Sequence, residues 1–465
     1  MIQIFKQLGR HWAACIAVVA LLFAQAYCDL SLPDYTSKIV DTGIQQGGIE
    51  SPVPESVRDT TLQALELLMS EQDAALAEQW YSAPDANGVR TLSFDASAAM
   101  PELEGAFSTP DVVLYMAAAQ NAAATSGAST PAVEDLDAAA AQMTAMVNVP
   151  GAREMLQARL QEEMSALDDS MADNLSQQAT LLVALEYEAQ GIAHDVQLAY
   201  LLRTGGRMLA LTLVMVAVSI AVGFLASRVS AAIGRDLRRD VFGTVVGYSN
   251  AEIEKFSTAS LITRTTNDIQ QVQFVCVILL RMVAYAPILG IGGILHVAEG
   301  DTGLEWIIFV AVAALLLLIA FLMSVALPKF KLMQTLVDRL NLVSREILTG
   351  IMPIRAFSRE AFEEQRFDKA NADLMKTQLF TNRTMVAMMP FMTLIMNGTS
   401  LLIVWFGGKA MDLGTMQVGE MIAFITYTMQ IVMSFLMLSM VAVMLPRAGV
   451  AADRIHEVIS TPASI

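Results

Sequence analysis

Six apolar stretches, between 18 and 30 residues long, recur along the chain and are separated by polar segments. About 20 apolar residues in a helix cross the roughly 30 Å hydrocarbon core of a bilayer, so each stretch can span a membrane. The predicted spans are residues 11–33, 198–227, 281–298, 304–327, 386–407 and 421–445. No secretory cleavage site follows the first stretch, which indicates a retained span. The pattern therefore predicts an all-α membrane protein with six transmembrane helices.

The second span is predicted to continue as a helix well beyond the bilayer. No proline interrupts residues 198–248, and a helix of about fifty residues measures about 75 Å, against a bilayer about 45 Å thick. The third span starts in the same way, with an apolar stripe at Ile269, Val272, Cys276, Leu279 and Val283. The arms would thus reach roughly 30 Å out of the membrane.

Short helices are predicted at the tips of two such hairpins. In the first hairpin, Ser257 and Thr258 are candidate caps, and the pair Thr265 and Asp268 fits a capping box at the start of the returning helix. The fourth and fifth spans repeat the design, with residues 350–371 at the tip. Long arms are costly to order, so a partner is expected to dock at these tips.

Basic residues gather at one end of the predicted spans. They are Lys6, Arg10, Arg228, Arg235, Arg238, Arg239, Lys329, Lys331, Arg339 and Arg345. By the positive-inside rule these segments are cytoplasmic, which places both chain termini inside the cell.

The segment between the first two spans is strongly acidic. Residues 50–195 contain 24 acidic and 4 basic residues, a net charge of −20, whereas the whole chain carries −17. On the topology above, this segment is extracellular. Its pattern predicts a mostly helical domain, including residues 151–190, with a less ordered part at residues 81–105. It either forms a lid or collects cationic ligands, or it is a solvated decoration.

The overall composition agrees with a membrane protein. The chain is 55% hydrophobic and 16% charged, with a mean hydropathy of +0.50, whereas soluble domains are about 45–50% apolar and about 25% charged. Cys15, Cys28 and Cys276 lie in or beside apolar runs without CxxC spacing, and four scattered histidines offer no metal spacing. We therefore expect no metal site in this chain and no nucleic-acid partner.

Four stretches together resemble one transporter family. "FSTASLITRTTNDIQQVQ" and "REILTGIMPIRAFSREAFEEQRFDKAN" are similar to the two intracellular loops of ATP-binding cassette (ABC) exporters of the multidrug type. "LPDYTSKIVDTGIQQG" resembles the outer end of that family's first helix, and "AADRIHEVIS" the end of its sixth. The resemblance covers residues 1–48 and 197–465, and it leaves out the acidic insertion, which departs from the family's usual short loop.

The resemblance implies a fold and a division into parts. The fold would be the type 1 exporter (type IV) transmembrane domain with a helical extracellular insertion. Residues 1–49 would form the first helix and its outer end, 50–195 the insertion, and 196–455 the other five helices with two coupling loops. Residues 456–465 would begin a linker to a nucleotide-binding domain.

The resemblance also implies coupling helices at the tips, which dock on nucleotide-binding domains. The first would lie near residues 254–262 and the second near 354–363. The candidate docking residues are Glu254, Phe256, Ser260, Leu261 and Arg264 in the first, and Ile354, Arg355, Phe357, Arg359 and Glu360 in the second. Helical spacing places Ile354, Phe357 and Ala361 on one face, as a docking knob with a charged rim would require. Alternatively, Phe357 packs only against its own arms.

The sequence contains no GxxxxGK[ST] phosphate loop and no LSGGQ-like stretch. Without the backbone donors and lysine of that loop, the chain has no cradle for ATP. The resemblance implies that ATP and Mg²⁺ bind to a nucleotide-binding domain, expected either later in the same polypeptide or as a separate chain. It further implies a second homologous half, identical or different, in a bacterial plasma membrane.

Polar and methionine-rich positions within the spans are candidates for a substrate cavity. They are Gln25, Asp29, Met392, Asn397, Gln430, Met433 and Met437. Polar groups inside spans often face a cavity or partner, and methionine suits promiscuous binding of apolar compounds. Ordinary helix packing is the alternative for the methionines.

The sequence thus predicts the membrane half of an ATP-driven exporter that moves amphipathic or hydrophobic compounds (drugs, lipids or peptides) by alternating access. The alternative function is that of a membrane receptor or scaffold, whose acidic domain senses a ligand and whose arms relay the signal. An ATPase domain encoded in frame after Ile465 would favour the exporter.

Overall fold

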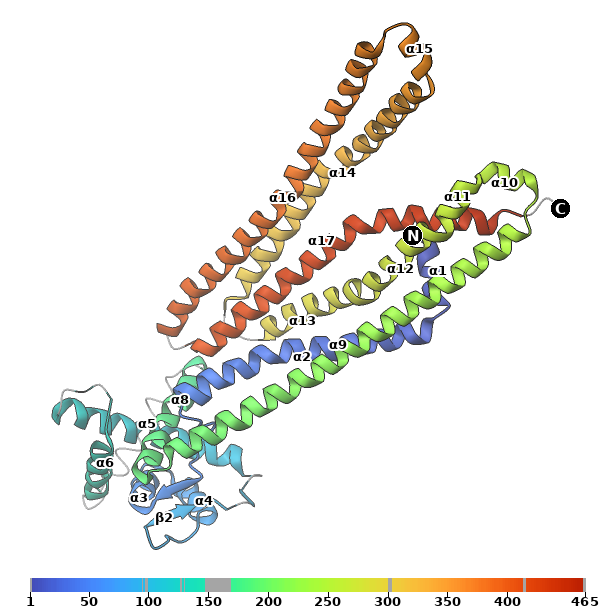
Figure 1. The fold of residues 1–465 in the computed structure, drawn as a ribbon. Coiled ribbons are helices and arrows are strands. Elements are labelled where there is room, and N and C mark those ends of the chain that lie inside the picture. The colour runs from blue at the N-terminus through green and yellow to red at the C-terminus, as the bar shows by residue number, and fades with distance from the viewer. Residues whose placement is uncertain are drawn as a thin grey trace. The chain divides into compact units, whose positions relative to one another are not determined.

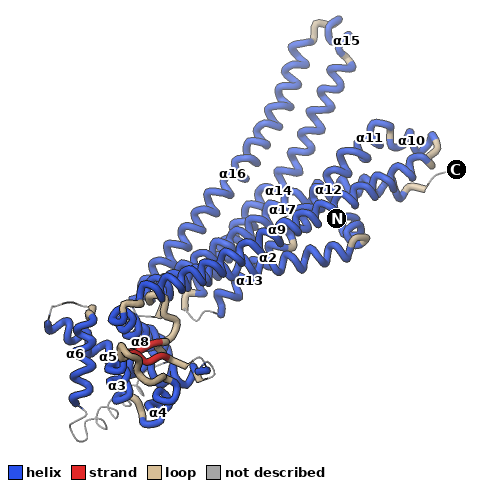
Figure 2. Tube along the Cα trace, turned by 60° about the horizontal axis from the view of Figure 1, so that its bottom comes forward, coloured by secondary structure: helices blue, strands red, loops and turns tan. Residues whose placement is uncertain are grey.

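A computed structural model describes residues 2–93, 95–96, 99–125, 128, 130–146, 169–299, 303–412 and 415–462. It divides into two compact units. Unit 1 comprises Met1–Tyr27, Val218–Trp405 and Ile425–Ile465, and unit 2 comprises Cys28–Ala217 and Phe406–Phe424. The ribbon and the tube show that nearly all of the described chain is helical (Figures 1 and 2).

The prediction of six membrane helices is confirmed. Six helical segments of the described chain are long and apolar enough to span a bilayer. The first segment consists of α2 (Trp12–Lys38) and the π-helix η1 (Ile39–Gln45), and the third runs from α11 to α13. The other four segments lie in the single helices α9 (Ala193–Val246), α14 (Glu305–Thr349), α16 (Glu360–Asp412) and α17 (Val418–Ser460). The remaining elements of these parts of the chain are α1 (Ile2–Gly9), α10 (Asn250–Phe256), α11 (Thr258–Thr263), η3 (Arg264–Asp268), α12 (Ile269–Ile278), η4 (Leu279–Val283), α13 (Tyr285–Glu299) and α15 (Ile351–Ala356).

The arms beyond the spans are also continuous helices. Helix α9 runs for 54 residues, and α14 and α16 run for 45 and 53. Pro328 and Pro390 lie inside α14 and α16 without ending them. The two helical hairpins end in short helices, α10 and α11 in one and α15 in the other, as Figure 1 shows.

The predicted capping box at Thr265 and Asp268 is wrong. Both residues lie inside a helical segment that continues from α11 through η3 into α12. The hydroxyl of Thr265 donates to the carbonyl of Leu261 at 2.7 Å, a bond made within a helix rather than at its start. The capping box lies upstream instead, where the backbone N–H of Ser249 donates to the Glu252 carboxylate at 2.7 Å before α10.

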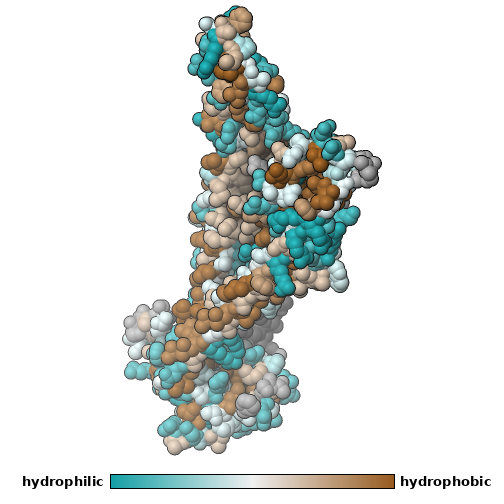
Figure 3. Space-filling view, turned by 45° about the vertical axis from the view of Figure 1, so that its right-hand side comes forward, coloured by the Kyte–Doolittle hydropathy of each residue, from teal (hydrophilic) through white to brown (hydrophobic). Residues whose placement is uncertain are grey.

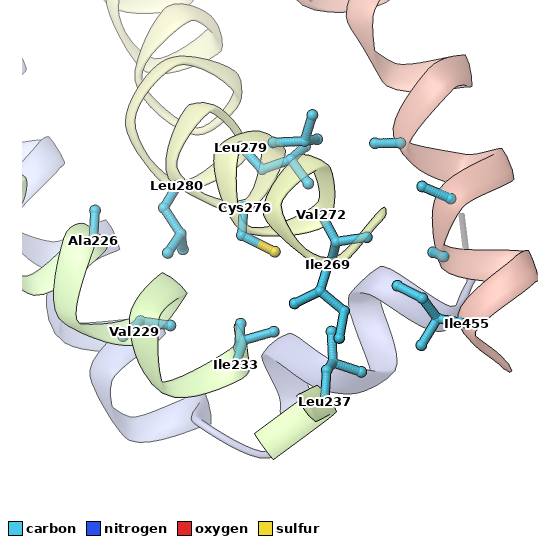
Figure 4. Packing of buried hydrophobic residues seen from close by; sticks show 14 of the residues in the cluster. Ala226, Val229, Ile233, Leu237, Ile269, Val272, Cys276, Leu279, Leu280 and Ile455 are labelled. Carbon is cyan, nitrogen blue, oxygen red and sulfur yellow. The ribbon is translucent and has the colours of Figure 1, made fainter. Parts of the chain in front are cut away.

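An apolar cluster in unit 1 joins α9, α12 and α17. Figure 4 shows side chains from α9 and from the segment α12–η4 pointing toward one another, with Ile455 of α17 beside them. Its fully buried members include Ala226, Ile233, Ile269, Cys276 and Val458. Small side chains in this set let the helix backbones approach closely, as is common in membrane helix pairs.

Glycine at position 234 of α9 permits a close approach to Gln273 of α12 beside this cluster. A Cβ there would collide with the side-chain amide of Gln273. Gln273 is held in place because its backbone carbonyl accepts from the hydroxyl of Ser230 at 2.6 Å and its side-chain oxygen accepts from Arg238 at 2.9 Å. The contact therefore fixes α9 against α12 by packing and by hydrogen bonds together.

Unit 2 contains an apolar core of its own. Its helices in the insertion are α3 (Asp59–Leu68), α4 (Glu71–Trp80), α5 (Met100–Thr125), α6 (Val133–Met146) and α8 (Asp169–Gln190). The cluster includes Val57, Leu62, Leu65, Phe107 and Leu114, all 1% exposed or less. The insertion therefore has the hydrophobic core that an independently folded domain needs.

One of two short strands in the insertion lies within residues 81–105, which were predicted to be less ordered. Strands β1 (Ser56–Arg58) and β2 (Val89–Thr91) pair in antiparallel register, with Val57 opposite Arg90, and they are red in Figure 2. Strand β2 and the start of α5 lie in the part predicted to be less ordered. The predicted helix over residues 151–168 lies outside the described residues, and the prediction of helix is correct for Asp169–Gln190.

A buried ion pair ties the start of the insertion to its last helix. Glu186 in α8 is only 1% exposed, and its carboxylate accepts from the Arg58 side chain at 3.0 Å and from the Thr61 hydroxyl at 2.8 Å. Arg58 also donates to Asp137 at 2.7 Å. A buried charge is costly unless it is paired. The network therefore holds three segments that are distant in sequence, β1 with the start of α3, α6 and α8, in one fixed packing.

Candidate functional site: the two hairpin tips

The tip between α9 and α12, here called tip one (residues 247–264), consists of two short helices separated by a single sharp turn. Ser257 adopts a φ of 59° between α10 and α11, and its side chain accepts a hydrogen bond from the backbone N–H of Ser260 at 3.4 Å. The predicted cap at Ser257 is therefore correct. This turn divides residues 254–262, near which the first coupling helix was predicted, between the end of α10 and α11. The coupling role of this tip stays a prediction.

Phe256 lies at the centre of tip one. Its ring stacks on that of Tyr248, with centroids 6.0 Å apart and planes at 7°. The guanidinium of Arg264 lies 4.9 Å from the ring centroid, and the ammonium of Lys255 lies 5.2 Å from it. Two cations over one aromatic ring are attracted by its negative faces, so Phe256 organises the tip from within.

Tip one is attached to the C-terminal end of α17. Arg264 donates to the backbone carbonyl of Arg454 at 2.8 Å and to the Glu457 carboxylate at 2.9 Å. The hydroxyl of Tyr248 donates to the carbonyl of Val458 at 2.6 Å. Charge-assisted bonds to two consecutive turns of α17 make the tip and the end of that helix one piece. Figure 1 shows the end of α17 beside α10 and α11.

The predicted docking residues of tip one divide into two groups. Phe256 and Leu261 are buried, at 5% and 7% exposure, so they cannot present a surface to a partner. Glu254 is exposed, and Ser260 and Arg264 are half-buried. Sequence reasoning missed Tyr248 and the end of α17 as the partners of this tip. The spacing of Ser249 and Glu252, which is that of a capping box, was a signal that could have located the start of α10.

The tip between α14 and α16, here called tip two (residues 350–366), has a different construction. Helix α15 ends at Ala356 and α16 begins at Glu360, and Ser358 between them has a φ of 50°. The prediction that Ile354, Phe357 and Ala361 share one helical face is therefore wrong, because the three residues do not lie on one continuous helix. The chain leaves the helix at Phe357, which is the C-cap that directly follows α15.

The surface of tip two is apolar and unusually exposed. Phe357 is 78% exposed, and no residue of α15 is buried. Packing of Phe357 against its own arms, the alternative interpretation, is thereby excluded. Other large apolar side chains exposed on or beside this tip are Leu348, Ile351, Met352 and Phe362. Figure 3 shows hydrophobic and hydrophilic residues intermixed at the end of this hairpin.

Charged residues surround the apolar side chains of tip two. Arg355, Arg359 and Glu360 are exposed, and the Arg359 guanidinium lies 6.0 Å from the ring centroid of Phe362. Arg366 pairs with Glu346 across the hairpin and thereby links α16 to α14. An apolar patch with a charged rim is the surface pattern of a protein interface.

The candidate cavity residues are placed in different surroundings. Met392 is buried, at 3% exposure, in a cluster with Leu315 and Val432, which favours packing for this methionine. Asn397 and Met433 are exposed, and Gln25, Asp29, Gln430 and Met437 are half-buried. Their part in a substrate cavity stays a prediction.

Comparison with known proteins identifies the family. Residues 191–435, more than half of the chain, match the family model of the ABC transporter transmembrane region. The chain belongs to this family. The matched region begins at residue 191, within the last residues of the acidic segment, and it includes both tips.

Relatives of this ABC transporter chain carry names of the same kind. An uncharacterized ABC transporter ATP-binding protein of Mycobacterium tuberculosis is 39% identical over 267 residues, which are 57% of this chain and 46% of the relative. One of Bacillus subtilis is 32% identical over 257 residues, 55% of this chain and 45% of the relative. The chain thus aligns with less than half the length of these curated relatives.

Proposed function

We propose that this chain is the membrane half of an ATP-driven exporter whose two tips receive nucleotide-binding domains. Those domains would bind ATP and Mg²⁺, and a second homologous half, identical or different, would complete the transport path. The transported molecules would be amphipathic or hydrophobic compounds, moved out of the cytoplasm by alternating access. Membership of the ABC transporter family and the relatives named as ATP-binding proteins support this proposal.

The exposure of Phe357 carries the proposal. A phenylalanine gains about 1.5–3 kcal/mol when it is fully buried, so a tip with a 78% exposed phenylalanine lacks that stabilisation until a partner covers it. The neighbouring Arg355, Arg359 and Glu360 would then form the rim of the interface. Helix α15 contains no buried residue, so the apolar side chains of this tip are not covered by the tip itself.

The two tips would transmit motion in different ways. Tip one is bonded to the end of α17, close to residues 456–465, where we propose that a linker to the nucleotide-binding domain begins. A movement of the linker would therefore reach tip one directly through Glu457 and Val458. Among the described residues, no hydrogen bond or ion pair attaches tip two to α17, so this tip would respond only to a domain docked on its surface.

The proposed division of the chain follows the sequence analysis. Residues 1–49 and 196–455 would form the six-helix membrane domain, and residues 50–195 a domain on the extracellular side. The core of the insertion and the net charge of −20 support an independent, water-exposed domain. Both chain termini would lie in the cytoplasm of a bacterial cell.

The test uses the polypeptide together with its nucleotide-binding domain, reconstituted in liposomes. Phe357→Ala should leave membrane insertion and ATP binding intact but abolish transport and the stimulation of ATP hydrolysis by substrate. Loss of an apolar anchor at an interface costs about 2 kcal/mol or more. The matched control is Phe367→Ala, a half-buried phenylalanine of α16 beyond the tip, which should have a milder effect. Normal transport with ordinary stimulation in Phe357→Ala would contradict the docking assignment.

A further inference from the structure

Unit 2 contains a cavity of about 490 Å³ beside the outer part of α9. Its walls come from four places: the segment that enters the insertion, the segment that follows β2, the end of α8, and the stretch of α9 from Val196 to Arg203. Cavities that bind small molecules typically measure about 300–1,000 Å³. The matched family region begins at residue 191, so the insertion contributes most of the walls.

The entry segment is held firmly against α9. Gly48 has a φ of 86°, and a Cβ there would lie 2.9 Å from the Cα of Gln197. The side-chain amide of Gln197 donates to the carbonyl of Gly43 at 2.9 Å. On the other side, the backbone N–H of Glu55 donates to the hydroxyl of Tyr187 at 2.8 Å. Both ends of the entry segment are thus fixed, and the cavity between them is part of the fold.

The cavity combines an apolar wall with aromatic and charged groups. Ile49, Leu92 and Val196 contribute apolar side chains, and Tyr200 contributes an aromatic ring. Apolar walls with a few placed polar groups are typical of sites for small organic molecules.

The charges around the cavity favour a cation. Glu50 and Glu55 are exposed at its wall, and neither forms an ion pair with another described residue. Arg203 is the basic residue that the described lining contains. Two carboxylates against one guanidinium, within a segment of net charge −20, produce a negative potential. The face of Tyr200 adds attraction for an ammonium group.

We propose that this cavity binds an amphipathic organic ammonium compound of drug-like size. The ammonium group would lie near Glu50 and Glu55, and the apolar part against Ile49, Leu92 and Val196. Binding here requires neither ATP nor a second half of the transporter. A binding experiment on this cavity therefore tests the proposed site independently of the proposed transport function.

The test measures binding to the full chain in nanodiscs of zwitterionic lipid, without nucleotide and at low salt. The probe is propranolol, a naphthyl amine, and the comparison is naproxen, a naphthyl carboxylate. Binding to empty nanodiscs is subtracted. Propranolol should bind saturably and naproxen should not. Equal binding of the two probes would overturn the proposal, because the cavity would then not select a cation.

Variants locate the site. Glu50→Gln combined with Glu55→Gln should weaken propranolol binding about tenfold or more, and Arg203→Gln should tighten it. Ala199→Phe, at an exposed lining position of α9, should block the cavity and weaken binding without disturbing the core. Unchanged affinity in the double variant or in Ala199→Phe would overturn the assignment.

The matched control is Glu71→Gln combined with Glu134→Gln. These two residues are exposed carboxylates of the same insertion that do not line the cavity. The control should bind propranolol within twofold of the unaltered chain. A loss as large as that of the Glu50 and Glu55 variant would mean that only the diffuse negative field attracts the cation, and it would overturn the proposed site.

Discussion

The carboxylate of Asp41 accepts a hydrogen bond from the backbone N–H of Gly419 at 2.6 Å. Asp41 lies in η1, at the end of the first membrane helix, and Gly419 lies in the first turn of α17. The first N–H groups of a helix have no partner within the helix, so a carboxylate supplied from a distant segment caps it. The hydroxyl of Ser37 donates to the second oxygen of the same carboxylate at 2.8 Å.

Loss of this cap should destabilise unit 2. Asp41→Ala should lower the free energy of unfolding by about 1–2 kcal/mol, because the N–H of Gly419 is left buried without an acceptor. Gly419→Ala should have a similar effect, since a Cβ at that position would collide with the Asp41 carboxylate. Thermal unfolding in nanodiscs measures both variants. The control is Asp412→Ala, an exposed aspartate at the end of α16; a loss as large in this control would contradict the capping role.

Separation of tip one from α17 should loosen the tip. Arg264→Ala removes the bonds to Arg454 and Glu457, so the amides of Asn250–Phe256 and Thr258–Thr263 should exchange hydrogen several-fold faster. Arg359→Ala, at the exposed tip two, is the matched control and should leave that exchange unchanged. If Arg264→Ala exchanges at the original rate, the contact with α17 does not hold the tip.

The buried carboxyl of Asp111 should make the stability of the insertion depend on pH. Asp111 is 0% exposed and has no hydrogen-bond partner among the described residues, and burial raises the pKa of its carboxyl well above the ordinary value. The folded state therefore holds a proton that the unfolded state releases above about pH 4. The stabilisation from this proton is present in full at low pH and is lost as the pH rises toward the folded-state pKa.

The variant Asp111→Asn has no titrating carboxyl at this position, so it tests whether the Asp111 proton causes the pH dependence of stability. Urea unfolding between pH 4 and pH 8 should show little difference at pH 4 and a growing advantage of the variant as the pH rises. Glu134→Gln, at an exposed glutamate of α6, serves as the control and should show no such trend. A constant difference between Asp111→Asn and the unaltered chain across this range would rule out the buried proton.

The proposed topology can be tested with single cysteines. In a chain whose three cysteines are replaced by serine, Ala75→Cys, exposed on α4, should react with an impermeant thiol reagent in intact cells. Met352→Cys, 73% exposed on α15, should react only after the cells are permeabilised. The reverse pattern would invert the orientation derived from the basic residues and place the acidic insertion inside the cell.

The sequence by itself determined the elements of the membrane domain. An apolar run of sufficient length has to be a helix in a bilayer, because every backbone polar group must be paired within it. The long continuation of α9 beyond the bilayer was predicted from another local feature, the absence of proline from residues 198–248. The sequence also identified Ser257 as a helix cap, because a capping side chain bonds to a backbone N–H only two or three residues further along the chain.

Only the tertiary structure decided which tip residues are available to a partner. Phe256 and Phe357 both lie in short charged segments, yet Phe256 is buried by Tyr248 and Arg264 whereas Phe357 is 78% exposed. The difference arises because α17, about 200 residues further along the chain, returns to tip one. The two strands of the insertion were missed for the same reason, since Val57 and Arg90 pair only when the chain folds back. Long-range packing of this kind leaves no local periodicity in the sequence, so a local pattern cannot predict it.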